Sequence, residues 1–320
     1  VLTSFALSVN HAFIYIRGEY PKPARRVQRA VDEAYAKGYL GTDILGSGFD
    51  LDITVHLGGG AYICGEESAL LNSLEGRRGE PRIKPPFPAV EGLYSKPTIV
   101  NNVETLSNVP WIVNNGGAAY ARIGPDTSAG TRMISLSGHV NKPGNYEIVM
   151  GMPWRDIIYD FGGGIPEGRE LKAWIPGGSS APWFVPEEHL DTPATIDDTG
   201  ERGSMMGSGA VIVMDDSTDV VAAAHRIVRF YAHESCGQCT PCREGTSWLE
   251  RILYRIMTGR GRRADLDLLL DVSDNISPGL AWPPLMTTIC PLGPSATAPV
   301  VSVMQYFRGE VEARMGGGDG

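Results

Sequence analysis

The order of apolar and polar positions predicts alternating strands and helices in the first third of the chain. An apolar run over residues 12–16 predicts a strand, and the amphipathic pattern of residues 23–37 predicts a helix that ends at Gly38. Residues 51–55 predict a second strand, and three glycines, Gly58–Gly60, precede a predicted helix over residues 66–74. This succession is typical of a parallel sheet with covering helices, so we expect an α/β fold here.

The pattern changes after residue 131. Strands are predicted at 133–137 and 146–150 around a turn at 141–144, followed by a short helix at 153–160 and by strands at 171–175 and 210–214. This order favours a small α+β domain of the β-grasp type, in which residues 187–203 form a polar loop. The last third predicts helices at residues 243–257, 265–271 and 295–308, after a helix that Ser217 or Thr218 caps and that reaches residue 232.

The two ends of the chain predict different things. The first sixteen residues carry no formal charge, but they lack the basic region and cleavage site of a signal peptide and are short for a membrane span. We expect a core helix running into a strand. Because the apolar pattern is already under way at Val1, we also expect the domain to be incomplete at its N-terminus. The glycines of residues 316–318 predict a disordered tail.

Composition restricts the class of protein. A chain of 320 residues with 42% hydrophobic content can bury the cores of two or three domains. Its net charge of −9 argues against nucleic acid or an anionic membrane surface as a partner. Five cysteines, four of which fall into one candidate site, suit a reducing compartment.

Cysteine spacing gives the strongest chemical signal. Cys236, Cys239 and Cys242 have C-x2-C-x2-C spacing on an expected tight turn, and Cys290 follows downstream in a Thr-Ile-Cys-Pro sequence. This triple spacing is typical of a [4Fe–4S] cluster, whereas structural zinc prefers two separated pairs. Zinc and disulfides remain the alternatives. The fifth cysteine, Cys64, is expected to be a packed small residue.

Two histidines near the cysteines are not expected to be metal ligands. His225 and His233 precede the cysteine run and could ligate a metal ion, but core or exposed positions are the expected ones. Arg243, which directly follows Cys242, is expected to favour the reduced state of a cluster through its positive charge.

A second group of motifs points to a nucleotide-like ligand. The glycine-rich turn before Glu66 and Glu67 could bring backbone amides to a cofactor, although two carboxylates would repel a phosphate and suit a neutral ring, a ribose or an amide. Four prolines in residues 80–88 stiffen a loop that presents Lys84 and Phe87. A structural turn and a surface linker are the alternatives. Asn101 or Asn102 could simply cap the helix that begins near Val103.

Taken together, these motifs resemble one family over essentially the whole chain. The residues that carry the resemblance are Gly60-Ala-Tyr-Ile-Cys-Gly-Glu-Glu67, Pro81-Arg-Ile-Lys-Pro-Pro-Phe-Pro88, Val100-Asn-Asn-Val-Glu-Thr105, Glu234-Ser-Cys-Gly-Gln-Cys-Thr-Pro-Cys-Arg243 and Thr288-Ile-Cys290. The chain resembles the NADH-binding flavoprotein subunit of respiratory complex I, which is the F subunit of bacterial NADH-quinone oxidoreductase. The resemblance implies an incomplete Rossmann-like FMN/NADH domain at residues 1–115, a β-grasp (ubiquitin-like) domain at 128–214 and a helical [4Fe–4S]-binding domain at 217–320.

The resemblance also implies roles for individual residues. Tyr62 and Glu67 would be catalytic. Residues that bind FMN or NADH would be Tyr62, Gly65, Glu66, Glu67, Lys84, Phe87, Asn101 and Asn102. The cluster ligands would be Cys236, Cys239, Cys242 and Cys290.

The implied activity is that of an NADH:quinone oxidoreductase. NADH would transfer a hydride to FMN, and single electrons would pass to the [4Fe–4S] cluster and onward to quinone. Implied partners are a thioredoxin-like [2Fe–2S] E subunit and a large iron–sulfur G subunit, on the cytoplasmic face of the cell membrane and without direct membrane insertion. The alternatives are a diaphorase subunit of an NAD-linked hydrogenase or formate dehydrogenase, or a non-catalytic relay whose cluster only stabilises the helical domain.

The chain departs from the family pattern in two places. The family's main flavin-binding glycine-rich loop would lie before Val1, so we expect only part of the flavin site here. An apparent insertion covers residues 277–286, between Cys242 and Cys290. It leaves the Thr-Ile-Cys context of Cys290 intact.

Overall fold

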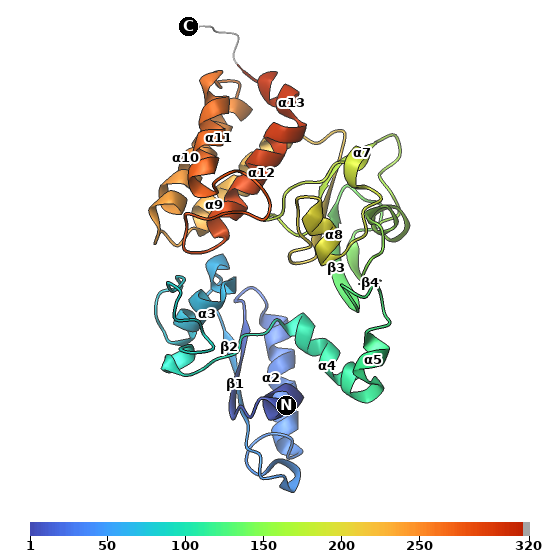
Figure 1. Ribbon diagram of the computed structural model, residues 1–320, viewed down its shortest axis with the longest axis vertical. Coiled ribbons are helices and arrows are strands. Elements are labelled where there is room, and N and C mark those ends of the chain that lie inside the picture. The colour runs from blue at the N-terminus through green and yellow to red at the C-terminus, as the bar shows by residue number, and fades with distance from the viewer. Residues whose placement is uncertain (316–320) are drawn as a thin grey trace. The chain divides into compact units, whose positions relative to one another are not determined.

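The computed structural model describes residues 1–315, which form two compact units, Val1–Gly116 and the described residues from Gly117 onward (Figure 1). The strands of the first unit pair in one sheet, and those of the second unit pair in another. The disordered tail predicted at residues 316–318 lies outside the described residues.

The first unit contains a βαβ arrangement. Strand β1 (His11–Ile16), helix α2 (Pro21–Ala36) and strand β2 (Asp52–Leu57) follow one another, and the two strands pair in parallel from His11↔Asp52 to Ile16↔Leu57 (Figure 1). Val31 of α2 is buried with Leu40, Ile44 and Leu51 against the strands. The predicted succession of strand, helix and strand is therefore confirmed. The unit's other elements are α1 (Leu2–Ala6), η1 (Ile44–Gly46), η2 (Tyr62–Gly65), α3 (Glu67–Leu74), η3 (Leu93–Ser95) and α4 (Val103–Asn115).

The N-terminal segment forms a helix, but the prediction of a core helix is wrong. None of the residues of α1 is buried, and Phe5 is 59% exposed. The reason is that α1 packs against α4, a helix that itself has no buried residue. The apolar composition of α1 does not show whether other elements of the unit cover it, and here they leave both α1 and α4 without a buried residue.

The second unit begins with a mixed four-stranded sheet. Strands β3 (Thr131–Gly138), β4 (Gly144–Val149), β5 (Leu171–Ile175) and β6 (Ala210–Asp215) lie in the order β4-β3-β6-β5. The central pair, β3 and β6, is parallel, whereas β4 and β5 are antiparallel to their neighbours. The four strands lie where the sequence predicts them. Helix α5 (Gly117–Tyr120) precedes the sheet, and the helix predicted at 153–160 is α6 (Trp154–Asp156) continued by the π-turn η4 (Ile157–Phe161).

The polar loop predicted at residues 187–203 is wrong. This stretch contains helices α7 (Pro186–His189) and α8 (Ile196–Glu201). The hydroxyl of Thr195 caps α8 by accepting the Asp198 amide at 2.8 Å. His189 is buried and its ring stacks on Phe184 at 4.1 Å. A local cap and a buried ring hold these short helices, and neither appears in a pattern of apolar periodicity.

Helices make up the rest of the unit: α9 (Val220–Glu234), α10 (Thr240–Met257), α11 (Ala264–Ile276), α12 (Leu292–Tyr306) and α13 (Arg308–Glu312). The four predicted helices exist, but α10 and α12 begin three residues early and α11 runs five residues further than expected. The predicted cap at Ser217 or Thr218 is wrong. Asp219 caps α9, because its carboxylate accepts the Ala222 amide at 3.0 Å.

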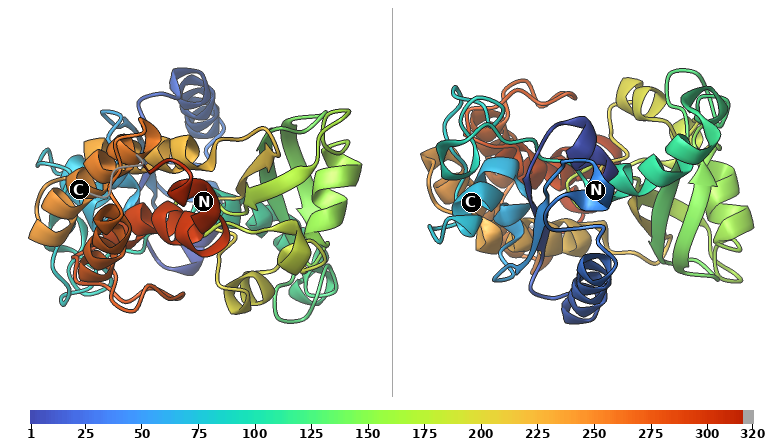
Figure 2. Two further views of the ribbon diagram at one scale, coloured as in Figure 1. Left: turned by 90° about the horizontal axis from the view of Figure 1, so that it is seen from above. Right: turned by 90° about the horizontal axis from the view of Figure 1, so that it is seen from below.

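The described residues of this unit form hydrophobic cores that join its elements. One lies around β3, η4 and the rings of Trp154, Trp174 and Phe184. Another joins Ala173 and Ile175 of β5 to buried residues of α9, α10, α11 and α12, so the sheet and the helices share one core. Helices α9–α12 lie together in all views (Figures 1 and 2). Within residues 1–315, no helix combines the length and the apolar character needed to cross a membrane.

A buried ion pair fixes the start of α11. The Asp265 side chain is fully buried, lies 2.7 Å from Arg255 Nη2 and accepts the Arg262 amide at 3.0 Å. Burial alone would raise the pKa of Asp265, but these partners hold the pKa below its usual value.

We predict that Asp265→Ala lowers the free energy of unfolding by about 2 kcal/mol, below the range for fully buried pairs because the Arg255 side chain is 35% exposed. Asp267→Ala is the matched control, since Asp267 is an exposed acidic residue in the same helical turn. Because the folded-state pKa of Asp265 is depressed, its contribution should be present above about pH 4 and lost as the pH falls below that. Thermal unfolding of the two variants at pH 7 measures how much stability each substitution removes, and equal losses for Asp265→Ala and Asp267→Ala would contradict the role given to Asp265.

Candidate functional site

The first candidate site starts at the glycine-rich turn after β2. A Cβ on Gly58 would clash with the ring and hydroxyl of Tyr15, so glycine permits the backbone to approach this side chain closely. The chain then forms the short turn η2 and enters α3. Gly65, the last residue of η2, has open space where a Cβ would be. A flat ligand could therefore approach the backbone at Gly65.

Glu66 caps α3 with its side chain. One carboxylate oxygen accepts the amides of Ser68 at 2.8 Å and of Ala69 at 2.9 Å, and the Ser68 hydroxyl donates to it at 2.5 Å. The negative charge also lies at the positive end of the helix. One oxygen of the Glu66 carboxylate is thus used by the helix cap. Glu67 follows in the first helical turn and does not take part in the cap.

Lys84 connects the proline-rich loop to both glutamates. Its ammonium lies 3.1 Å from Glu66 Oε1 and 2.5 Å from Glu67 Oε1. Burial alone would lower the pKa of Lys84, but the two carboxylates raise it above its usual value. Burial likewise opposes ionisation of Glu66, yet the cap hydrogen bonds and Lys84 hold its pKa below the usual range. Two carboxylates therefore share one ammonium group at this point.

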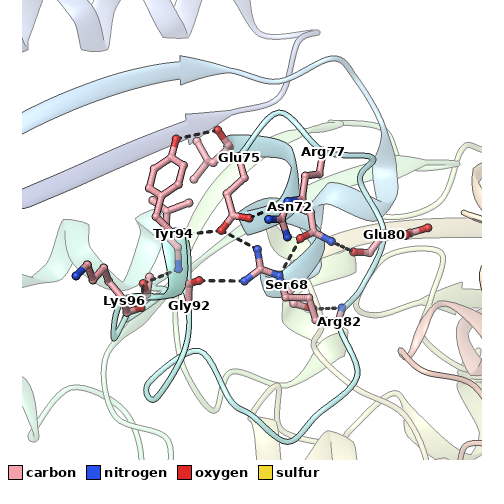
Figure 3. Close-up of polar contacts among 12 residues, drawn as sticks. Ser68, Asn72, Glu75, Arg77, Glu80, Arg82, Gly92, Tyr94 and Lys96 are labelled. Atoms are coloured by element: carbon pink, nitrogen blue, oxygen red, sulfur yellow. Dashed lines mark hydrogen bonds and ion pairs between the residues drawn. The ribbon is translucent and has the colours of Figure 1, made fainter.

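Arg82 anchors the same loop to α3 and to the following segment (Figure 3). Its guanidinium donates to the Asn72 amide oxygen at 2.8 Å and to the Gly92 carbonyl at 3.0 Å, and it lies 2.9 Å from Glu75 Oε1. Glu75 is largely buried and also accepts the Tyr94 amide at 2.8 Å. Breaking this network would leave the largely buried Glu75 carboxylate with the more distant and exposed Arg77, 3.5 Å away, so the loop has a strongly preferred position.

Ser68 provides a third connection. Its hydroxyl donates to Glu66 and accepts the Arg82 backbone amide at 2.9 Å. One hydroxyl thus links the glycine–glutamate turn to the proline-rich loop. The two motifs that the sequence suggests as separate nucleotide signals form one connected structure.

Other predicted ligand-binding residues lie at the surface of this unit. Tyr62 and Phe87 are exposed, as rings that stack on a ligand would be before it binds. Asn102 caps α4 by accepting the Glu104 amide at 2.7 Å, so the capping alternative is correct for this residue. Among the described residues, neither Asn101 nor Asn102 hydrogen-bonds to Lys84 or to its two glutamates.

The second candidate site lies in the helical part. Cys236 follows the end of α9, Cys239 is the N-cap of α10, and Cys242 lies in its first turn. The expected tight turn is therefore correct for the first two cysteines only. Cys290 is two residues before α12. The four sulfurs are close enough for Cys236, Cys239 and Cys242 each to perturb the pKa of Cys290.

Burial shapes the chemistry of two of these thiols. It raises the pKa of Cys242 and of Cys290 to about 11. Both thiols are protonated at pH 7 without a metal, and bound iron would have to displace the protons.

The donor set consists of four cysteines. Thiolates are the ligands that hold [4Fe–4S] clusters, one at each iron, so four cysteines that lie near one another fit such a cluster. Within residues 1–315, no three Cys, His, Asp or Glu side chains are arranged to hold one metal ion.

Hydrogen bonds brace the cysteine turn. Gly237 has a φ of +79°, which favours glycine, and its amide donates to the Ser235 hydroxyl at 3.4 Å. Arg243 donates to the Gly237 carbonyl at 3.0 Å and to Glu244 at 2.9 Å. Arg243 therefore holds the turn together, and Glu244 offsets part of the charge that was expected to favour a reduced cluster.

Close packing of α10 and α12 against α11 brings Cys290 near the other three cysteines. A Cβ on Gly245 of α10 would lie 2.7 Å from Ile276, and one on Gly293 of α12 would lie 3.0 Å from it. The two glycines thus let both helices approach α11 closely. The apparent insertion at residues 277–286 lies between α11 and α12. Its ends are held by Ser277, which donates to the Leu285 carbonyl at 3.0 Å, and by Thr287, which donates to the Asn275 carbonyl at 2.7 Å.

The remaining cysteine and histidines occupy the expected kinds of position. Cys64 is a buried free thiol, and Gly79 packs against its sulfur. His225 is buried with its Nε2 atom 2.9 Å from Glu250, and His233 is exposed on the last turn of α9.

Comparisons with known families match three parts of the chain. Residues 1–111 match the Nuo51 FMN-binding domain, residues 132–213 match the SLBB domain, and residues 222–314 match the NADH-ubiquinone oxidoreductase-F iron-sulfur binding region.

Curated relatives decide the family. Two proteins named as the F subunit of NADH-quinone oxidoreductase, from Mycobacterium tuberculosis and Streptomyces coelicolor, are 50% and 51% identical over 99% of this chain. The chain belongs to the family of NADH-quinone oxidoreductase F subunits. It covers 69% and 68% of these two relatives. Family membership confirms the expected NADH-dependent oxidoreductase with FMN and a [4Fe–4S] cluster as cofactors.

Solved structures give the same fold. A chain of an NAD⁺-reducing [NiFe]-hydrogenase in the H₂-reduced state is similar over 100% of the present chain. The TM-score is 0.87 and the sequence identity is 34%. The air-oxidized state matches 98% with a TM-score of 0.84 and the same identity of 34%. The chain spans about half the length of those hydrogenase chains.

Sequence reasoning missed several residues that build the two sites: Ser68, Arg82, Ser235, Gly245 and Gly293. Arg82 lies in the proline-rich loop of residues 80–88. A cation in a loop stiffened by prolines was the signal that could have marked it as an anchor of that loop. The glycines within α10 and α12 were also visible as positions that weaken a helix unless packing requires them.

We predict that the two neighbouring glutamates differ in their effect on stability. Glu66→Ala removes the cap of α3 and should lower the free energy of unfolding by about 1–2 kcal/mol. Glu67→Ala removes a half-exposed ion pair and should cost less than about 0.5 kcal/mol. Denaturant unfolding of both variants measures the difference. If Glu67→Ala costs as much as Glu66→Ala, the division of roles is wrong.

Proposed function

We propose that this chain is the electron-input subunit of an NADH:quinone oxidoreductase, in which NADH is oxidised at FMN and electrons continue through a [4Fe–4S] cluster towards quinone. FMN, when bound, would accept a hydride from NADH and release the two electrons singly, which nicotinamide does not do readily. The protein must bind and orient both ligands and hold the cluster.

In this proposal the first unit binds FMN and NADH. The open backbone at Gly65 takes the edge of a ring, with Tyr62 and Glu67 as the catalytic residues beside the nicotinamide. Lys84 and Phe87 serve NADH, and Asn101 and the side-chain amide nitrogen of Asn102 serve FMN. Glu66 contributes mainly by capping α3 and orienting Lys84.

The observation that supports this assignment most directly is the ion pairing of Lys84 with Glu66 and Glu67. It joins the two motifs at one point, and the same two motifs carry exposed rings and open glycine backbone. A site of net negative charge also disfavours a phosphate beside the glutamates and leaves that place to a neutral ring, ribose or amide.

The cluster would be held by Cys236, Cys239, Cys242 and Cys290. Thiolates are the ligands that iron–sulfur clusters prefer, and α10 directs its positive N-terminal end at Cys239 and Cys242.

The runner-up is a diaphorase subunit of an NAD-linked hydrogenase or formate dehydrogenase. The hydrogenase structures favour it through fold, but their identity of 34% is below the 50% shared with an NADH-quinone oxidoreductase relative. Both candidate functions use the same cofactors, so sequence identity decides between them.

We propose three domains within the two units: a Rossmann-like domain at residues 1–115, a β-grasp domain at 128–214 and a helical cluster domain at 217–320. The parallel β1–β2 pair and the β4-β3-β6-β5 order support the first two. The proposed partners are a thioredoxin-like [2Fe–2S] E subunit and a large iron–sulfur G subunit, in a peripheral arm on the cytoplasmic face of the membrane.

We predict that Cys236→Ser, Cys239→Ser, Cys242→Ser and Cys290→Ser each lower the iron and sulfide content of the purified protein and abolish the normal cluster EPR signal, because a hydroxyl is a poorer iron ligand than a thiolate. Cys64→Ser is the control and should keep full iron. Stoichiometric zinc without iron in anaerobically prepared wild-type protein would contradict the cluster assignment.

We predict that Glu67→Gln changes the kinetics of NADH oxidation in the assembled enzyme while iron and flavin contents stay normal. The substitution keeps the shape of the side chain but removes the charge that pairs with Lys84. NADH–ferricyanide assays give kcat and KM. Unchanged values for both would remove Glu67 from the nicotinamide site.

A further inference from the structure

The serine before the first cysteine lies against the sulfur of the third. Ser235 Oγ is 3.2 Å from Cys242 Sγ, a normal length for a hydrogen bond that involves sulfur. The contact joins two helices, because Ser235 is the C-cap of α9 and Cys242 lies in the first turn of α10. The Ser235 backbone amide donates to the Tyr231 carbonyl at 2.9 Å, which fixes Ser235 in place.

The direction of this hydrogen bond follows from the neighbouring groups. The Ser235 oxygen accepts the Gly237 amide at 3.4 Å, which leaves its O–H free to point elsewhere. A thiolate that ligates iron has no proton and can only accept. In the loaded site, the hydroxyl must therefore be the donor and Cys242 the acceptor.

We propose that Ser235 sets the reduction potential of the [4Fe–4S] cluster by donating a hydrogen bond to the Cys242 thiolate. The proposal rests on the cluster assignment made above and adds a positioning residue to it. A donor beside a ligand sulfur stabilises the extra negative charge of the reduced cluster and so raises the midpoint potential. Because Cys242 is buried, water screens this interaction weakly.

The charges near this sulfur do not replace the hydroxyl. Arg243 directs its guanidinium to the Gly237 carbonyl, to the Thr240 hydroxyl and to Glu244. Its positive charge is therefore shared with a carboxylate, whereas the Ser235 hydroxyl contacts the sulfur itself.

The test is a potentiometric EPR titration of the assembled enzyme with wild-type, Ser235→Ala, Ser235→Thr and Ser295→Ala protein. Ser295 is the matched control, because it follows Cys290 closely but donates to the Pro291 carbonyl rather than to a sulfur. We expect Ser235→Ala to shift the midpoint to lower potential at normal iron content. Ser235→Thr, which keeps the hydroxyl, should restore the wild-type midpoint, and Ser295→Ala should leave it unchanged.

An unchanged midpoint in iron-replete Ser235→Ala protein would overturn the proposal. If Ser235→Ala takes up less iron, Ser235→Thr decides: normal iron and a wild-type midpoint support the hydroxyl, and behaviour like the alanine variant contradicts it. Failure of the cluster assignment would look different, because wild-type protein would then contain no iron.

Discussion

The shared hydrophobic core of sheet and helices is the constraint on which the cluster site depends. Four cysteines from two distant segments can meet only if α9, α10 and α12 pack in one fixed arrangement. Buried residues of β5 and of all four long helices provide that arrangement. Gly245 and Gly293 let α10 and α12 approach Ile276 of α11 without a side chain between them. Packing, rather than the spacing of the cysteines, brings Cys290 to the other three.

The candidate site of the first unit, Val1–Gly116, depends on polar contacts rather than on a shared hydrophobic core. Ser68, Arg82 and Lys84 tie the proline-rich loop to α3. Such networks are costly to leave half satisfied, so they specify one loop position. The exposed rings and open glycine backbone then remain for ligands.

The sequence predicted what depends on local pattern. The triple cysteine spacing, the β1–α2–β2 succession and the glycine–glutamate turn are visible because their residues are neighbours. It failed where a few hydrogen bonds decide the structure: Thr195 starts a helix within a polar stretch, and Asp219 rather than Ser217 caps α9. The contacts of Arg82 and Ser235 join segments whose approach depends on tertiary packing, so the motifs contain these residues but do not show which groups they contact.

The most direct test of the central claim is low-temperature EPR of the assembled enzyme after anaerobic addition of NADH. We predict the signal of a reduced [4Fe–4S] cluster at an intensity matching the iron content, because FMN, when bound, would pass electrons from NADH to a cluster held by the four cysteines. A cluster that dithionite reduces but NADH does not, in protein with full flavin, would contradict the account.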